Sequence, residues 1–254
     1  MALLEVDSIS KSFGGVAAVK DFSMVQGREE ISGIIGPNGA GKTTAFNLIT
    51  GVQPLDSGRI FFDGTEITSL PSHCITRLGI ARTFQNIRLF HNLNVLENLM
   101  MAGGTRLSYS TWEEMFRLPR VVSQEKRLEK IARSYLSYFH LEKYSMQRPD
   151  SLPYGLQRRL ELARALMLEP SLLLLDEPAA GLNPREIHNL IELIYKIKEE
   201  KRLSIIIVEH HMELVMNICS KIHVLDFGLK IAEGKPEEIK KNPEVLQAYL
   251  GEEV

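Results

Sequence analysis

The stretch Gly36-Pro37-Asn38-Gly39-Ala40-Gly41-Lys42-Thr43-Thr44 matches the pattern G-x-x-x-x-G-K-[ST] of loops that hold nucleotide phosphates. The apolar residues 31–35 before it predict a buried strand, and residues 45–49 after it predict the first turns of a helix. Glycine lets the chain bend tightly and brings backbone N–H groups close to phosphate oxygens. The order strand, glycine-rich turn, helix therefore indicates a phosphate-binding loop that includes every residue of the quoted stretch.

Two side chains of this loop have the chemistry to act on a triphosphate. Lys42 would reach the β- and γ-phosphates, and the Thr43 hydroxyl would bind Mg²⁺. The N-terminus of the following helix adds backbone donors and the positive end of its dipole. A glycine-rich turn that holds a lysine by chance is the alternative, and the predicted strand and helix on either side argue against it.

Composition limits the classes of protein to consider. The chain has 254 residues and 44% hydrophobic residues, enough for one large α/β domain or two small ones. Its net charge is −2 with no long basic run, so we expect no nucleic-acid partner. Cys74 and Cys219 lack metal or redox spacing and are expected to be free thiols. The longest apolar run, 172–175, is too short to cross a bilayer, so another subunit would supply any membrane span.

Along the chain, the pattern predicts short strands, then a helical middle, then alternating helices and strands. A strand that follows a helix implies a right-handed crossover and a mostly parallel sheet. We expect a nucleotide-binding core at about 1–85 and 160–254 and a helical subdomain at about 86–159, with Trp112 as a packing residue. The predicted strands are 3–6, 22–25, 59–62, 172–175 and 204–208, and the predicted helices are 123–139, 160–168, 184–198 and 236–241, before a C-terminal tail.

A second chemical cluster is the run 172–178, Leu-Leu-Leu-Leu-Asp-Glu-Pro. A buried strand that ends in acids brings them to the carboxyl edge of a parallel sheet, where α/β proteins bind ligands. Asp176 would hold Mg²⁺, and Glu177 would orient and polarise an attacking water. Helix capping by an acid is the alternative for this run alone.

With both motifs present, the chain resembles the ATP-binding subunits of ABC transporters over essentially its whole length. The resemblance implies an α/β P-loop NTPase core with a mostly parallel sheet, an antiparallel β subdomain and an inserted α-helical subdomain. It also implies ATP and Mg²⁺ as cofactors and ATP hydrolysis coupled to transmembrane transport. Gln85 lies where this family has a glutamine that contacts Mg²⁺ or water, His210 matches the switch histidine, and Phe13 lies where an aromatic ring stacks on adenine.

The chain departs from the family pattern at two places that bear on which ATPase subunit it pairs with. The usual Leu-Ser-Gly-Gly-Gln signature reads Leu-Pro-Tyr-Gly-Leu at 152–156, and Pro153 offers neither hydroxyl nor N–H to a phosphate. Asn183 stands where the family has an aspartate after the acid pair. In the family, the signature acts on ATP bound by the opposite subunit of a head-to-tail dimer. We therefore expect a second, different ABC ATPase subunit with an intact signature.

Local stretches narrow the resemblance further. Residues 80–85, 94–100 and 154–161 and the C-terminal run 248–253 are similar to the ATPases of prokaryotic importers for branched-chain amino acids. The resemblance implies integral membrane permease partners and a peripheral place at the cytoplasmic face of the cell membrane. Two other functions stay open: a non-transport ABC ATPase, and a nucleotide-dependent regulator that hydrolyses weakly.

Overall fold

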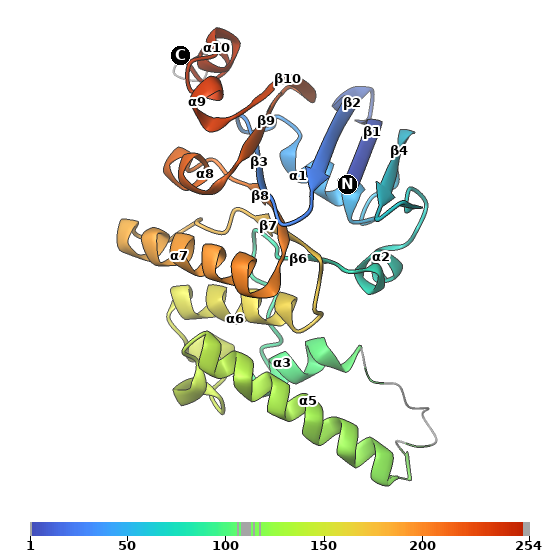
Figure 1. Cartoon of the computed structure of the whole chain (residues 1–254), viewed down its shortest axis with the longest axis vertical. Coiled ribbons are helices and arrows are strands. Elements are labelled where there is room, and N and C mark those ends of the chain that lie inside the picture. The colour runs from blue at the N-terminus through green and yellow to red at the C-terminus, as the bar shows by residue number, and fades with distance from the viewer. Residues whose placement is uncertain (1, 106, 108–112, 114, 117, 251–254) are drawn as a thin grey trace. The chain divides into compact units, whose positions relative to one another are not determined.

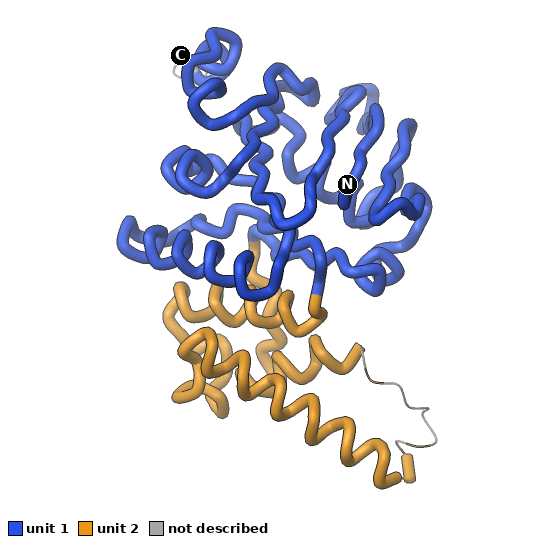
Figure 2. The backbone as a smooth tube through the Cα atoms, in the orientation of Figure 1, with its two compact units in different colours: residues 1–85, 170–254 blue, residues 86–169 orange. Residues whose placement is uncertain are grey.

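The computed structural model describes residues 2–105, 107, 113, 115–116 and 118–250, in two compact units. One unit contains residues 1–85 and 170–254, and the other contains 86–169 (Figure 2). The second boundary lies ten residues later than the sequence indicated, because helix α6 (Tyr154–Leu166) packs against α3 (Val95–Gly104). Trp112 lies outside the described residues.

The larger unit is built on a six-stranded sheet of order β10-β9-β3-β8-β7-β6 (Figure 1). All neighbours pair in parallel except β10, which is antiparallel to β9. β3, β7 and β8 are buried along their whole lengths, which explains why apolar residues dominate all three. The expected mostly parallel sheet is confirmed. Its strands are β3 (Ile31–Ile35), β6 (Ile80–Arg82), β7 (Leu172–Asp176), β8 (Ser204–Val208), β9 (Lys221–Asp226) and β10 (Leu229–Gly234).

A second, antiparallel sheet of order β2-β1-β4-β5 belongs to the same unit. Its first two strands are longer than predicted, because the Gly14-Gly15 turn joins them into one hairpin in which Phe13 pairs with Val16. Helix α1 (Lys42–Ile49) buries Phe46 and Ile49 in a core shared by both sheets. The strands are β1 (Ala2–Phe13), β2 (Val16–Gly27), β4 (Ser57–Phe62) and β5 (Thr65–Glu66).

The remaining helices of the larger unit include three, at 72–78, 212–218 and 243–250, that the sequence did not predict. Residues 243–250 were expected to be a tail but form α10 (Pro243–Leu250), which starts with a proline and whose Glu244 N–H donates to Asn242 Oδ1 at 2.9 Å. Val245 of this helix is buried, so tertiary contact supports the helix. The others are α2 (Ser72–Leu78), α7 (Pro184–Lys201), α8 (Met212–Ile218) and α9 (Pro236–Ile239).

The smaller unit is helical. Its helices start earlier than the hydrophobic pattern indicated: α5 is Pro119–Tyr138, and α6 begins at Tyr154 directly after Pro153. Two 3₁₀ turns, η1 (Glu142–Tyr144) and η2 (Pro149–Ser151), lie between them. The Tyr135 hydroxyl of α5 donates to the Leu166 carbonyl at the end of α6, at 3.2 Å. Over the described residues of both units, no helix has the length and apolar content to cross a membrane.

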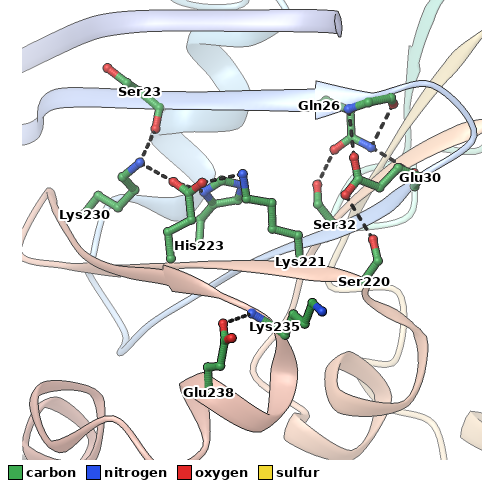
Figure 3. Close-up of polar contacts among 12 residues, drawn as sticks. Ser23, Gln26, Glu30, Ser32, Ser220, Lys221, His223, Lys230, Lys235 and Glu238 are labelled. Carbon is green, nitrogen blue, oxygen red and sulfur yellow. Dashed lines mark hydrogen bonds and ion pairs between the residues drawn. The ribbon is translucent and has the colours of Figure 1, made fainter. Parts of the chain in front are cut away.

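A cluster of charges joins the two sheets of the larger unit (Figure 3). Glu233 on β10 accepts from Lys221 and Lys230, and Lys230 Nζ also donates to the Ser23 carbonyl on β2 at 2.8 Å. His223 Nδ1 lies 3.3 Å from Glu233 Oε2 and is fully buried. Burial lowers the pKa of His223 to about 4, although the Glu233 charge opposes this shift.

The buried imidazole should make folding stability depend on pH. Between pH 6.5 and about 4, His223 stays neutral in the folded chain while the unfolded chain binds a proton, so stability falls as pH falls. Urea unfolding at pH 7.0 and 5.5 should show a loss of about 1 kcal/mol from this residue. His223→Leu should abolish this part of the loss, whereas His188→Leu, at an exposed position, should retain it. An unchanged pH dependence in His223→Leu would contradict the assignment.

Candidate nucleotide-binding and hydrolysis site

Three parallel strands of the larger unit bring the sequence motifs to one edge. Ile34 of β3 pairs with Val208 of β8, and Val208 is also level with Asp176 of β7. The loop that begins at Gly36, the acid pair and the segment after Val208 therefore all leave the sheet at its carboxyl edge (Figure 1). This edge is where open α/β sheets bind ligands.

The loop has a backbone path that requires glycine. Gly36, Gly39 and Gly41 have φ values of 150°, 77° and 99°. A Cβ on Gly36 would lie 2.0 Å from the Leu225 carbonyl oxygen, and one on Gly41 would lie 2.2 Å from the Ala18 carbonyl oxygen. Backbone therefore packs against both ends of the loop, whereas a Cβ on Gly39, at the tip, would meet nothing within 4 Å beyond its chain neighbours. The loop is a rigid cradle that is open at its centre.

Lys42 is held inside this cradle. Its Nζ donates to the carbonyls of Gly36 and Pro37, both at 2.7 Å, and the residue is 6% exposed. Helix α1 begins here without a side-chain cap and without an acid in its first turn, which leaves its N-terminus favourable for an anion. Asn38 and Thr43 are exposed beside it. Of the other loop residues, Pro37 and Ala40 are buried and Thr44 is half-buried.

Arg82, which the sequence analysis did not single out, connects Asp176 to α1. Arg82 Nη2 forms a 2.7 Å ion pair with Asp176 Oδ2, and both side chains are at most 5% exposed. The same guanidinium donates to Asn47 Oδ1 at 2.7 Å and Thr50 Oγ1 at 3.2 Å, and packs near the ring of Phe46. Arg82 thus links the end of β7 to the phosphate-loop helix.

Glu177, Gln85 and His210, which the sequence placed far apart, come together. Glu177 has a left-handed φ of 47°, rare outside glycine, and its N–H donates to the Val208 carbonyl at 2.8 Å. This bend directs the carboxylate so that Oε2 accepts from Gln85 Nε2 at 2.8 Å and lies 3.8 Å from His210 Nδ1. His210 is half exposed, while Glu177 is largely covered. A carboxylate, an amide and an imidazole therefore converge at this edge.

Glu209 is a second residue that the sequence analysis missed. It is fully buried, and its carboxylate accepts three backbone N–H groups: Ala179 at 2.7 Å, His210 at 2.9 Å and His211 at 3.1 Å. Glu209, His210 and His211 have the composition of a metal site. Both carboxylate oxygens of Glu209 already accept hydrogen bonds from backbone N–H groups. Glu209 therefore holds the backbone in place and does not act as a metal ligand. The sequence signal that could have identified Glu209 is its position as an acid directly after a buried apolar strand.

The residues of the site fit ATP and Mg²⁺. The loop holds its path only without a Cβ at Gly36 and Gly41, and a buried ammonium with an uncapped helix N-terminus suits phosphate oxygens. Asp176 and Thr43 offer the oxygen ligands that Mg²⁺ prefers. Phe13, expected to stack on adenine, ends β1; the residue is 46% exposed, and Lys11 Nζ lies 5.7 Å from the centroid of its ring. That ring is accessible to a planar base.

The two departures from the expected motifs have local structural roles. Asn183 caps α7: its Oδ1 accepts the Glu186 N–H at 3.0 Å, and Glu186 Oε2 accepts the Asn183 N–H at 2.9 Å. Aspartate would cap equally well, so this change is structurally conservative. Pro153 is the residue before α6, and that helix has no side-chain cap. Tyr154 is exposed, with the Arg158 guanidinium 5.3 Å from its ring centroid.

Comparison with known proteins agrees with this geometry. Residues 19–180 match the ABC transporter family, and residues 230–254 match the family described as branched-chain amino acid ATP-binding cassette transporter. The chain is 42% identical over 250 residues to the high-affinity branched-chain amino acid transport ATP-binding protein BraF of Pseudomonas aeruginosa, and 40% identical to LivG of Escherichia coli, covering 98% of each chain in both cases. It superposes on the crystal structure of the ADP conformation of an ABC transporter ATP-binding cassette with a TM-score of 0.85 at 30% identity, covering 99% of each chain.

Fold and site together define a P-loop ATPase in which an acid pair lies at the end of a parallel strand of the central sheet. The chain belongs to the ABC transporter family, as an ATP-binding and ATP-hydrolysing subunit.

The buried pair of Arg82 and Asp176 should be important for stability. Arg82→Met leaves the Asp176 charge buried without its cation, which should cost about 3–5 kcal/mol in chemical denaturation. Adding Asp176→Asn should recover part of the loss, because no unpaired charge is then buried. The matched control is Arg28→Met at the exposed pair with Asp63, which should cost under about 1 kcal/mol. Equal small losses at the two positions would contradict the role of Arg82.

Proposed function

We propose that this chain powers the import of branched-chain amino acids or a related small polar solute, at the cytoplasmic face of the membrane and bound to integral membrane permease subunits. The catalytic part of this proposal rests on one observation: the side chains of Gln85, Glu177 and His210 lie in contact at the carboxyl edge of the sheet. The solute class rests on the relatives named for branched-chain amino acid transport and on the matching C-terminal residues 230–254.

In this proposal the loop from Gly36 to Thr44 binds the phosphates of ATP. Gly36, Gly39 and Gly41 allow backbone N–H groups to face the phosphate oxygens, and Lys42 exchanges its carbonyl partners for the β- and γ-phosphates. Thr43, Asp176 and Gln85 would hold Mg²⁺. That ion would neutralise part of the phosphate charge.

Glu177 is the residue that handles water. Its carboxylate would accept a hydrogen bond from the attacking water and polarise it for in-line attack. Gln85 already donates to Glu177 Oε2, so it fixes the direction of that carboxylate. His210, next to Glu177, would contact the γ-phosphate. Hydrolysis would then release the γ-phosphate that His210 contacts. The subunit would leave the conformation that bound ATP favours.

The active assembly in this proposal is a head-to-tail dimer with a second ABC ATPase subunit. The N-terminal turn of α6 faces the ATP of the opposite subunit, as the signature does in the family. Pro153 at its start has no N–H and no hydroxyl, so it contributes less to a phosphate than serine would. This loss supports a different partner with an intact signature, which would complete the site built on Lys42.

Two substitutions should separate nucleotide binding from hydrolysis. Lys42→Ala should weaken ATP binding about 10- to 100-fold, because a charged hydrogen-bond donor is lost. Glu177→Gln should retain ATP affinity and lose about 10²-fold or more in turnover. Fluorescent-nucleotide titration and phosphate release measure the two effects, with Lys240→Ala at an exposed helix end as control. Near-normal turnover of Glu177→Gln would assign water activation to another residue.

The unequal-pair proposal is tested by mixing subunits. ATP turnover should be low for this chain alone and rise when it is combined with a second ATPase subunit that has a serine in its signature. Pro153→Ser should raise the turnover of the isolated chain, because it restores the missing hydroxyl. Full turnover by the unmodified chain alone would show that the partner need not differ.

A further inference from the structure

The geometry points to Glu209 as a positioning residue of the hydrolysis site, which acts through its neighbour His210. This inference rests on the proposed function, because it deepens the role given there to His210. Glu209 follows the last residue of β8 and comes one position before His210. It is fully buried, and a buried carboxylate needs several donors to offset the cost of desolvation.

Three backbone N–H groups of loops at the site donate hydrogen bonds to this carboxylate, and His210 Nδ1 lies 3.8 Å from Glu209 Oε2. Oε2 accepts from His210 at 2.9 Å and His211 at 3.1 Å, which fixes the chain immediately after β8. Oε1 accepts from Ala179 at 2.7 Å, two residues after Glu177. One rigid group thus ties the segment that carries His210 to the segment that carries Glu177.

The two oxygens of a carboxylate suit this arrangement. It has acceptors on both oxygens and no donor, which matches three N–H groups that converge from two loops. Glutamine has the same size, but its NH₂ group would face at least one N–H, donor against donor. The loop that loses its acceptor would then move, and His210 would leave its place 3.8 Å from Glu177.

A second consequence concerns the segment between Ala179 and Asn183. Its first N–H is held by Glu209, and its last residue caps α7. The segment is therefore fixed at both ends, and the end nearer the site is fixed by the residue beside His210.

The experiment is a double-mutant cycle on the full chain in its active assembly. Glu209→Gln should lower the kcat for ATP hydrolysis about 10- to 100-fold while the affinity for a fluorescent ATP analogue changes less than about twofold. In a background of His210→Ala, Glu209→Gln should cause almost no further loss, because both substitutions remove the same function. Glu213→Gln, an exposed acid in the first turn of α8, is the matched control and should leave turnover unchanged.

The outcomes are distinguishable. Normal kcat in Glu209→Gln beside a strongly impaired His210→Ala would overturn the role of Glu209 alone, as would additive losses in the double variant. Full turnover in His210→Ala would overturn the proposed function of His210, and this inference with it. Thermal unfolding checks that Glu209→Gln is folded; if it is not, Glu209→Asp retains the charge on a shorter side chain and should show the same split between kcat and affinity.

Discussion

The in-register pairing of β8 between β3 and β7 is the constraint on which the site depends. It sets Ile34, Val208 and Asp176 level with one another at the carboxyl edge of the sheet. Because a parallel sheet repeats the same direction in every strand, the phosphate loop, the acid pair and the histidine segment emerge side by side. A shift of one residue in β8 would turn its side chains to the opposite faces and displace His210 from Glu177.

Charges buried behind that edge hold the loops in place. Arg82 joins Asp176 to the helix of the phosphate loop, and Glu209 joins the segments that carry His210 and Glu177. Each is expensive to bury and is surrounded by partners, which is the arrangement expected where geometry matters more than net stability. The backbone of Glu177 is also costly, because its φ is in the left-handed region. A hydrogen bond to Val208 fixes this conformation, which directs the carboxylate toward Gln85.

Pattern reasoning worked best where the local sequence had one physical solution. The phosphate loop and the buried strands 31–35, 172–175 and 204–208 were predictable because short, mostly apolar runs bounded by glycine or acids have few alternatives. It was weaker at helix ends and at the C-terminus. Helix α10 was expected to be a tail because its short apolar stripe forms a helix only when Val245 is buried against the fold.

By itself, the sequence determined the chemistry available to this protein: a glycine cradle with Lys42, an acid pair after a buried strand, and the family to which these motifs belong. Only the tertiary structure decided how distant residues combine. Arg82 contacts Asp176 across 94 positions, and Glu209 contacts Ala179 across 30. Such pairings arise from strand order and register, which are set by the packing of the whole sheet, and no local pattern in the chain encodes them.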